Sequence, residues 1–218
     1  MAVMRITQYY KKIDKSGLPL FTESENITSC KERKLMDLIQ DHPIIAAVKN
    51  EDELDRALTS ECRVIFLLFG SLLNIDTLVA RVKEKEKAVI VHIDFVEGLS
   101  GKEIAVDFLQ KYCYPDGIIS TRGTLIKRAK KLGMITIHRI FILDSLSADN
   151  ISTVLESSDP DYVEILPGII PRVIQEVCRR TRTPVITGGL IKTKEEVIND
   201  LNAGAVAVST SCSEVWNM

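Results

Sequence analysis

Residues 184–211 read PVITGGLIKTKEEVINDLNAGAVAVSTS, and this stretch holds one complete unit of the pattern that decides the fold. A short apolar run over Pro184 to Thr187 is followed by an amphipathic segment from Lys194 to Ala203 and then by a second apolar run from Ala205 to Ser209. Such alternation is typical of parallel strands connected by helices. Gly204 stands where the helix should end, as a C-terminal cap.

The same alternation extends through the chain from residue 44 and gives eight units. The predicted strands are Ile44 to Val48, Val64 to Leu68, Ala88 to Ile93, Gly117 to Ser120, Met134 to Ile140, Asp161 to Ile165, Pro184 to Thr187 and Ala205 to Ser209. Eight units predict an α/β fold, a single-domain (β/α)8 barrel of the TIM type. An open, doubly wound sheet is the alternative, because periodicity does not report whether a sheet closes.

Between these strands, apolar residues recur at helical spacing. The predicted helices include Glu51 to Leu58, Gly101 to Lys111, Thr124 to Leu132, Ile170 to Arg180 and Lys194 to Ala203, and Gly133 marks a second glycine cap. A helical stretch from Lys34 to Gln40 leads into the first strand. Residues 1–33 are rich in Lys, Thr, Ser and Glu and do not follow the alternation, so we expect a flexible extension before a barrel domain of residues 34–218.

Composition narrows the class of protein. The chain has 218 residues, 45% of them hydrophobic, which is enough to bury one core. Its net charge of -2 supplies no global field that would attract nucleic acid or an anionic membrane. The five cysteines form no C-x-x-C pair, and no apolar run approaches the ~18 residues of a membrane span. We expect a cytoplasmic protein with no membrane partner, no cofactor and no bound metal.

The ends of the last two strands carry a pattern for binding phosphate. In TIM barrels the loops after strands seven and eight often hold a phosphate group. Here Gly188-Gly189-Leu190 follows the seventh strand, and Ser209-Thr210-Ser211 ends the eighth. Glycine lets backbone N–H groups approach an anion, the hydroxyl groups can donate, and a short helix from near Ser211 or Ser213 would direct its positive end at the ligand. A tight turn capped by serines is the alternative.

Other strand ends predict a second group of polar side chains at the same mouth of the barrel. His92 and Asp94 are two residues apart and should share one face of the third strand. We expect hydrogen bonds to the hydroxyl groups of a small phosphorylated metabolite; acid–base catalysis, coordination of a divalent cation and a buried core histidine are the alternatives. For the cations Lys49 and Arg139, internal ion pairing is the alternative. The set comprises Lys49, His92, Asp94, Glu97, Arg139 and Glu164.

Basic residues gather on units six and seven, which are neighbours in a barrel. They predict one patch that contacts RNA phosphates, formed by Arg179, Arg180, Arg182, Lys192 and Lys194. A competing cluster spans Lys127 to Lys131 on unit four. Solvated helix faces commonly carry such charges, and the sequence contains no familiar RNA-binding motif.

Several ordered blocks make the chain resemble a known family. They are Ala47-Val48-Lys49-Asn50, His92 to Gly98, Gly117 to Arg122, Arg139 to Ser145, Glu164 to Pro171, Gly188 to Ile191, and Val208 to Ser211 with Trp216. From about Pro43 to Trp216 the chain resembles the bacterial glycerol-3-phosphate-responsive antiterminators, which regulate glycerol uptake operons.

The resemblance implies a protein that binds glycerol 3-phosphate and, in that state, acts on leader mRNA so that transcription passes a terminator. It implies binding without turnover. The second hypothesis is a barrel enzyme, an isomerase, lyase or transferase, that works on a small phosphate ester. Both hypotheses need the phosphate site, and they differ in whether Asp94, Glu97 and Glu164 transfer protons or hold hydroxyl groups.

Overall fold

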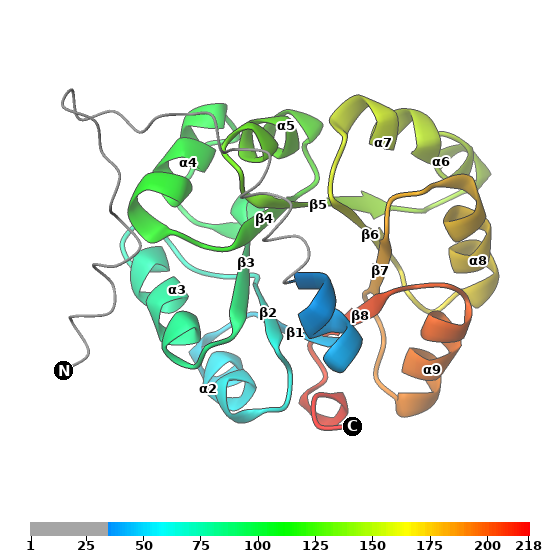
Figure 1. The fold of residues 1–218 in the computed structure, drawn as a ribbon, viewed down its shortest axis with the longest axis horizontal. Helices are drawn as coiled ribbons and strands as arrows, with labels where there is room; N and C mark the ends of the chain where they lie inside the picture. Colours follow the sequence, from blue (N-terminus) through cyan, green and yellow to red (C-terminus); the bar gives the residue numbers. More distant parts are fainter. Residues whose placement is uncertain (1–34) are drawn as a thin grey trace.

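The computed structural model describes residues 35–218 and contains a closed barrel of eight parallel strands in chain order (Figure 1). This order confirms the predicted (β/α)8 barrel and excludes the open, doubly wound sheet. The expected flexible extension, residues 1–33, lies outside the described residues. The strands are β1 (Ile44–Val48), β2 (Val64–Leu67), β3 (Ala88–His92), β4 (Gly117–Ser120), β5 (Ile135–Phe141), β6 (Tyr162–Leu166), β7 (Val185–Gly188) and β8 (Ala207–Thr210).

Helices return the chain from the C-terminal end of each strand to the start of the next (Figure 1). The helix predicted over Gly101 to Lys111 corresponds to α4 (Glu103–Phe108), which is shorter and passes into a π-helical turn, Leu109–Cys113. Helices α3, α6 and α7 were not singled out from the sequence. The helices are α2 (Glu51–Thr59), α3 (Ile75–Glu84), α4 (Glu103–Phe108), α5 (Gly123–Lys131), α6 (Ser145–Asp149), α7 (Ile151–Ser158), α8 (Pro171–Arg180) and α9 (Lys194–Asn202), preceded by a helix over residues 35–41.

Predicted and observed strand ends differ by one or two residues, for local reasons. Asp161 was assigned to β6, but its carboxylate accepts hydrogen bonds from the backbone N–H and the hydroxyl of Thr136 at 2.8 and 2.7 Å. Pro184 was assigned to β7, but proline has no N–H to donate to a strand ladder. Both residues close the turn before their strand.

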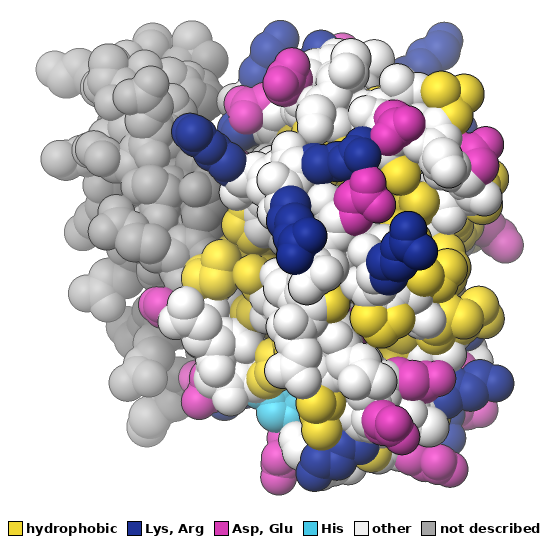
Figure 2. Space-filling view, turned by 90° about the vertical axis from the view of Figure 1, so that its right-hand side faces the viewer, with side chains coloured by type: hydrophobic (Ala, Val, Ile, Leu, Met, Phe, Trp, Pro, Cys, Tyr) yellow, Lys and Arg dark blue, Asp and Glu magenta, His cyan; other side chains and the backbone are white. Residues whose placement is uncertain are grey.

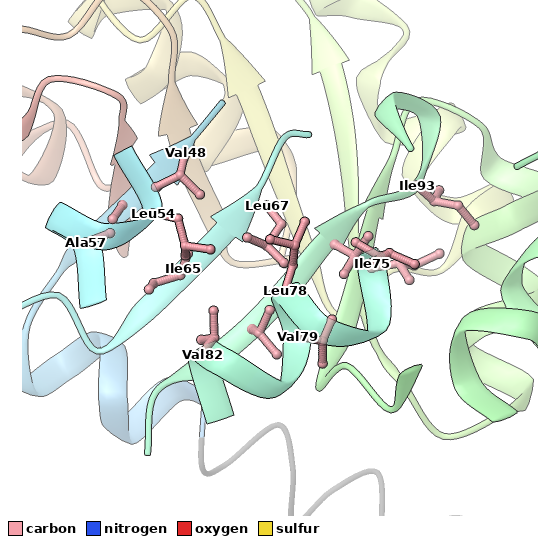
Figure 3. Packing of buried hydrophobic residues seen from close by; sticks show 14 of the residues in the cluster. Val48, Leu54, Ala57, Ile65, Leu67, Ile75, Leu78, Val79, Val82 and Ile93 are labelled. Atoms are coloured by element: carbon pink, nitrogen blue, oxygen red, sulfur yellow. The ribbon is translucent and has the colours of Figure 1, made fainter. Parts of the chain in front are cut away.

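The apolar residues of the strands form two layers. Alternate residues such as Ile45, Phe66 and Ile186 fill the barrel, and Leu35 and Ile39 of the first helix pack onto this inner cluster at its N-terminal end. The intervening residues point outward and pack under the helices; Figure 3 shows this outer layer between β1, β2, β3 and the helices α2 and α3. The period of two along each strand dictates both layers.

Glycine caps end two helices as predicted. Gly133 after α5 and Gly204 after α9 have φ values of 68° and 110°, a region that L side chains rarely adopt. At its other end α9 starts with a capping box between Thr193 and Glu196. These signals fix where the loops at each end of the barrel begin. No helix within residues 35–218 is long and apolar enough to cross a membrane.

Candidate functional site

A cavity of about 500 Å³ lies at the C-terminal mouth of the barrel, beside β1, β2 and β3. Its volume suits a small metabolite. Lys49 and Glu97, both in the predicted set, contribute to its wall. The sequence analysis did not single out the apolar side chains of this wall as site residues. The lining residues are Lys49, Leu68, Phe69, Gly70, Phe95 and Glu97.

His92, the last residue of β3, lies directly behind Phe95, which lines this cavity. The two rings are stacked with centroids 4.1 Å apart, and His92 is 1% exposed. Burial and the nearby Arg139 charge lower the pKa of His92 to about 3, against the opposing effect of Asp94. The imidazole is therefore neutral, with one donor and one acceptor nitrogen. Within the described residues neither ring nitrogen has a hydrogen-bond partner, which is uncommon for a buried polar group.

Asp94 is close to His92 but is already engaged. The chain turns into a 3-10 helix, Ile93–Phe95, directly after β3. The Asp94 carboxylate accepts from the Ser120 hydroxyl and the Thr121 N–H, both at 2.9 Å, and lies 3.6 Å from Arg122 Nε. Nδ1 of His92 is 3.9 Å from the same carboxylate. Asp94 thus joins the loop after β3 to the loop after β4.

Arg139 and Glu164 form an ion pair inside the barrel, just below the mouth. They are register partners on β5 and β6, and they are 7% and 0% exposed. Arg139 Nε donates to one carboxylate oxygen of Glu164, and the Ser209 hydroxyl donates to the other at 2.6 Å. The internal ion pairing weighed for these residues is therefore what the structure contains. Their predicted contact with a metabolite stays a prediction.

The loop after β7 presents backbone donors next to β8. Gly189 and Leu190 have φ values of 78° and 66°. Within residues 35–218, no oxygen accepts a hydrogen bond from the backbone N–H groups of Gly189, Leu190 or Ser211. Lys49 Nζ donates to the Ser211 hydroxyl at 2.9 Å, so a cation from β1 lies beside these donors. Free N–H groups next to an ammonium group form a natural anion site.

Three other residues of the predicted phosphate set have internal roles. The Thr210 hydroxyl donates to the Ile191 carbonyl at 2.7 Å and accepts from the Cys212 N–H at 3.0 Å, and the Ser209 hydroxyl is bound to Glu164. A Cβ on Gly188 would stand 2.4 Å from that Ser209 hydroxyl oxygen and 2.8 Å from Glu164, so glycine is needed there for packing. The expected short helix is one 3-10 turn, Ser213–Val215, too short for a substantial dipole.

A buried acid that the sequence pattern missed lies behind the loop after β7. Asp200 of α9 is 1% exposed, and its Oδ2 lies 2.9 Å from where a Cβ on Gly168 would stand. Burial raises the pKa of Asp200 to about 6, against the opposing effect of the nearby Thr187 side chain. Its helical spacing from the buried Val197 was the signal that could have found it.

The predicted basic patch is divided between the two ends of the barrel. Arg179 and Arg180 end α8, at the N-terminal ends of the strands, and Arg182 follows them before β7. Lys192 and Lys194 come after β7, at the mouth. Because a helix of ten residues is about 15 Å long, these groups cannot form one compact patch. The prediction overlooked that helices run opposite to the strands they connect.

Arg180 is further neutralised by two carboxylates. Its guanidinium donates to Asp149 and to Glu176, both at 2.6 Å. Figure 2 shows the side of the molecule that carries α6 to α9, where Lys and Arg side chains are interspersed with Asp and Glu. Within the described residues, Arg179 and Arg182 take part in no ion pair. Across residues 35–218, no group of three or more His, Cys, Asp or Glu side chains is placed to hold a metal ion.

Comparison with known proteins places the chain in a family. Residues 44–216 match the family described as glycerol-3-phosphate responsive antiterminator. The chain belongs to this family. It is 41% identical over 184 residues to the Escherichia coli (strain K12) protein named "Uncharacterized protein YgcP", a match that covers 84% of this chain and 96% of the relative.

Two crystal structures share both fold and sequence with this family member. The glycerol uptake operon antiterminator regulatory protein from Listeria monocytogenes is 36% identical, with a TM-score of 0.78 over 81% of this chain and 95% of that one. A glycerol uptake operon antiterminator-related protein from Thermotoga maritima is 34% identical, with a TM-score of 0.72 over 80% and 98% of the two chains.

The buried ion pair gives a stability prediction. Replacing Glu164 with Gln leaves the Arg139 guanidinium buried without a counterion and should lower the free energy of unfolding by about 3 kcal/mol. Urea denaturation measures this difference. The exposed Glu176→Gln variant, which removes a carboxylate from Arg180, should cost less than about 1 kcal/mol. The double variant Arg139→Met/Glu164→Leu should be more stable than Glu164→Gln, and equal losses in both would contradict the internal pairing.

Proposed function

We propose that this protein binds glycerol 3-phosphate at the mouth of the barrel and acts on leader mRNA as a transcription antiterminator of glycerol utilisation genes. Family membership supports the regulatory role. The observation that carries the site is His92, a buried neutral imidazole with two unpartnered nitrogens beside a cavity of suitable size. A hydroxyl group both donates and accepts, so it can satisfy either nitrogen.

The phosphate end of the ligand belongs at the loops after β7 and β8. The N–H groups of Gly189, Leu190 and Ser211 donate to the phosphate oxygens, and Lys49 supplies a positive charge from β1. Gly188, Ser209 and Thr210 hold these loops in place through their internal contacts. The phosphate group of glycerol 3-phosphate fits this arrangement because anions favour free backbone donors and a nearby cation.

The glycerol end of the ligand belongs in the cavity between Lys49, Phe95 and Glu97. His92 and Glu97 bind the hydroxyl groups, while Asp94 fixes the loops around them. Arg139 and Glu164 form the floor of the site, and burial together with the Arg139 charge keeps His92 neutral. This division modifies the initial expectation that all six polar residues contact the ligand.

The same geometry favours binding over catalysis. Glu164 is already paired with Arg139 and Ser209, so no free carboxylate is provided there for proton transfer. Lys49 is exposed, whereas a lysine that forms a Schiff base is usually desolvated. We therefore expect glycerol 3-phosphate to be recovered unchanged after long incubation with the protein.

The RNA contact belongs at the N-terminal end of the barrel. Arg179 and Arg182 are basic, and no carboxylate of the described residues pairs with them. Titrating glycerol 3-phosphate by calorimetry, with and without labelled leader RNA, measures ligand binding, RNA binding and their coupling. Loss of RNA binding with retained metabolite binding would separate the regulatory half of the proposal from the ligand half.

Gly189 provides the test of the phosphate loop. The Gly189→Val variant places a branched side chain at a positive φ and against Leu166, so backbone donors can no longer approach the anion. Affinity for glycerol 3-phosphate should fall at least ~10-fold, or about 1.4 kcal/mol. Gly204→Val is the matched control, since it introduces similar strain at the far end of α9. Equal affinities of the Gly189→Val variant and the parent would remove the assignment.

His92 separates the two ends of the ligand. The His92→Phe variant keeps an aromatic ring against Phe95 but removes both ring nitrogens. Its affinity for glycerol 3-phosphate should fall about 10-fold, which corresponds to one lost hydrogen bond of about 1.4 kcal/mol. Inorganic phosphate, measured by the same calorimetry, should bind as it does to the parent. A variant that loses both ligands equally would show that His92 supports the fold or the phosphate end.

Charge reversal tests the RNA surface. Arg179→Glu/Arg182→Glu should weaken binding to leader RNA and unrelated RNA together, because phosphate contacts carry no sequence information. The slope of log affinity against log salt should drop by roughly 0.7 to 0.9 per lost contact. Lys127→Glu/Lys131→Glu on α5 is the matched control. Filter binding in which the first pair behaves like the control would refute this surface.

A further inference from the structure

A buried polar cluster lies between α9, β7 and the loop after β6. Its members are Asp200 of α9, which is 1% exposed, and Thr187 of β7, which has no exposure. The Thr187 side chain is close enough to Asp200 to act on its pKa. Within the described residues, neither Asp200 Oδ2 nor Thr187 Oγ1 has a hydrogen-bond partner. Buried polar atoms are rarely left in this state, which makes the cluster unusual in a well-packed barrel.

The unpartnered oxygen of Asp200 lies against Gly168, in the loop after β6. A Cβ added to Gly168 would stand 2.9 Å from Asp200 Oδ2, 2.6 Å from Ile191 Cδ1 and 3.2 Å from the Gly188 nitrogen. The carboxyl group and the Ile191 side chain therefore close the space beside the Cα of Gly168. Because these atoms are in close contact, they oppose any movement of Gly168 toward α9.

Gly168 in turn orients the backbone of the loop after β7. Its N–H donates to the Gly188 carbonyl at 2.7 Å and to the Gly189 carbonyl at 3.2 Å. Each carbonyl belongs to a planar trans peptide unit, whose N–H is that of the next residue and points the opposite way. The two N–H groups, of Gly189 and Leu190, are thereby directed away from Gly168. They are the proposed phosphate donors.

We propose that Asp200 is a positioning residue of the anion site, which supports Gly168 so that Gly168 holds both peptide units in their donor orientation. This inference rests on the proposed function, because it takes the N–H groups of Gly189 and Leu190 as phosphate donors. Asp200 acts through Gly168 and does not touch the ligand. A neutral side chain of the same shape gives the same support, so the charge of the carboxylate has a separate effect.

That charge makes phosphate binding depend on pH. Burial raises the pKa of Asp200 to about 6, while Thr187 opposes the rise and Glu196 adds to it. Ionised Asp200 places a negative charge behind the anion site, and like charges destabilise each other. The neutral form therefore binds phosphate more tightly, and bound phosphate raises the pKa of Asp200 further. Above about pH 6, binding is then accompanied by the uptake of a proton from solvent.

No cation of the described residues neutralises Asp200. Its carboxyl group takes part in no ion pair within residues 35–218. The strands β7 and β8 and residues 167–170 contain no charged side chain, and burial raises the pKa of the Cys178 thiol on α8, which keeps it neutral. The other charged side chains on the surrounding elements are exposed, except for the half-buried Glu196. They are Lys192, Lys194, Glu195 and Glu196 beside and on α9, and Arg172, Glu176, Arg179 and Arg180 on α8.

Two variants of Asp200 test the support and the charge separately. Asp200→Ala opens space beside Gly168, so calorimetry should show affinities for glycerol 3-phosphate and inorganic phosphate reduced about 10-fold at both about pH 5 and about pH 8. Asp200→Asn keeps the shape without the charge and should bind as the parent does at about pH 5. Between about pH 5 and about pH 8 the parent should lose affinity about 10-fold relative to Asp200→Asn, which corresponds to a pKa raised by about one unit on binding. The ionisation of the ligand itself cancels in this ratio.

Asp161→Ala is the matched control. Asp161 precedes β6 at the opposite end of the barrel, and its side chain is 4% exposed. Its carboxylate accepts hydrogen bonds from Thr136, so its loss should lower the free energy of unfolding. The affinity for both anions and its dependence on pH should match those of the parent, because Asp161 is far from the loop after β7.

Each outcome decides the proposal. An Asp200→Ala variant that binds as the parent does, or that loses no more affinity than Asp161→Ala, overturns the positioning role. A ratio of parent to Asp200→Asn affinity that is the same at both pH values overturns the effect of charge. If Asp200→Ala is unfolded by circular dichroism, Asp200→Ser, which also leaves space beside Gly168, gives the same comparison.

The two ligands separate this inference from the proposed function. A parent protein that binds inorganic phosphate but not glycerol 3-phosphate refutes the proposed metabolite, and the Asp200 comparison is then decided with inorganic phosphate. A parent that binds glycerol 3-phosphate while Asp200→Ala binds it equally well refutes the role of Asp200 alone. A parent that binds neither anion overturns both.

Discussion

The ion pair between Arg139 and Glu164 is the constraint on which the rest of the mouth depends. A carboxylate with no exposure must be paired, because an isolated buried charge is strongly unfavourable. The pairing links β5 to β6, and the hydroxyl of Ser209 extends it to β8. Gly188 of β7 lacks a side chain because the same cluster occupies the space of a Cβ. Four consecutive strands are thereby fixed by one polar cluster.

That cluster also determines the chemistry of His92. The positive charge of Arg139 adds to the effect of burial and holds the imidazole in its neutral form, with a pKa of about 3. A neutral ring offers one donor and one acceptor, and Asp94 is held away from it by Ser120 and Thr121. The two nitrogens of His92 therefore need one acceptor and one donor at the mouth, and a hydroxyl group can act as either. A phosphate oxygen, which only accepts, would satisfy one nitrogen and not the other.

The strands and the mouth could be predicted from sequence because both follow from local pattern. A period of two gives each strand, and every parallel strand ends at the same rim. The hydrogen-bond partner of each polar side chain could not be predicted, because the partners come from other strands and loops. Thr210 and Ser209 look like free hydroxyl groups in the sequence, but one binds Ile191 and the other binds Glu164. The division of the basic patch, in contrast, could have been predicted from the sequence. Arg179 at the end of α8 lies at the start of β7, whereas Lys192 lies beyond the end of β7.

The loop after β7 connects the inner and outer surfaces of the mouth. Its backbone N–H groups at Gly189 and Leu190 serve the proposed phosphate site, while the Leu190 side chain is 64% exposed to solvent. Positive φ at both residues is what allows this arrangement, since an ordinary extended strand end would place the chain differently.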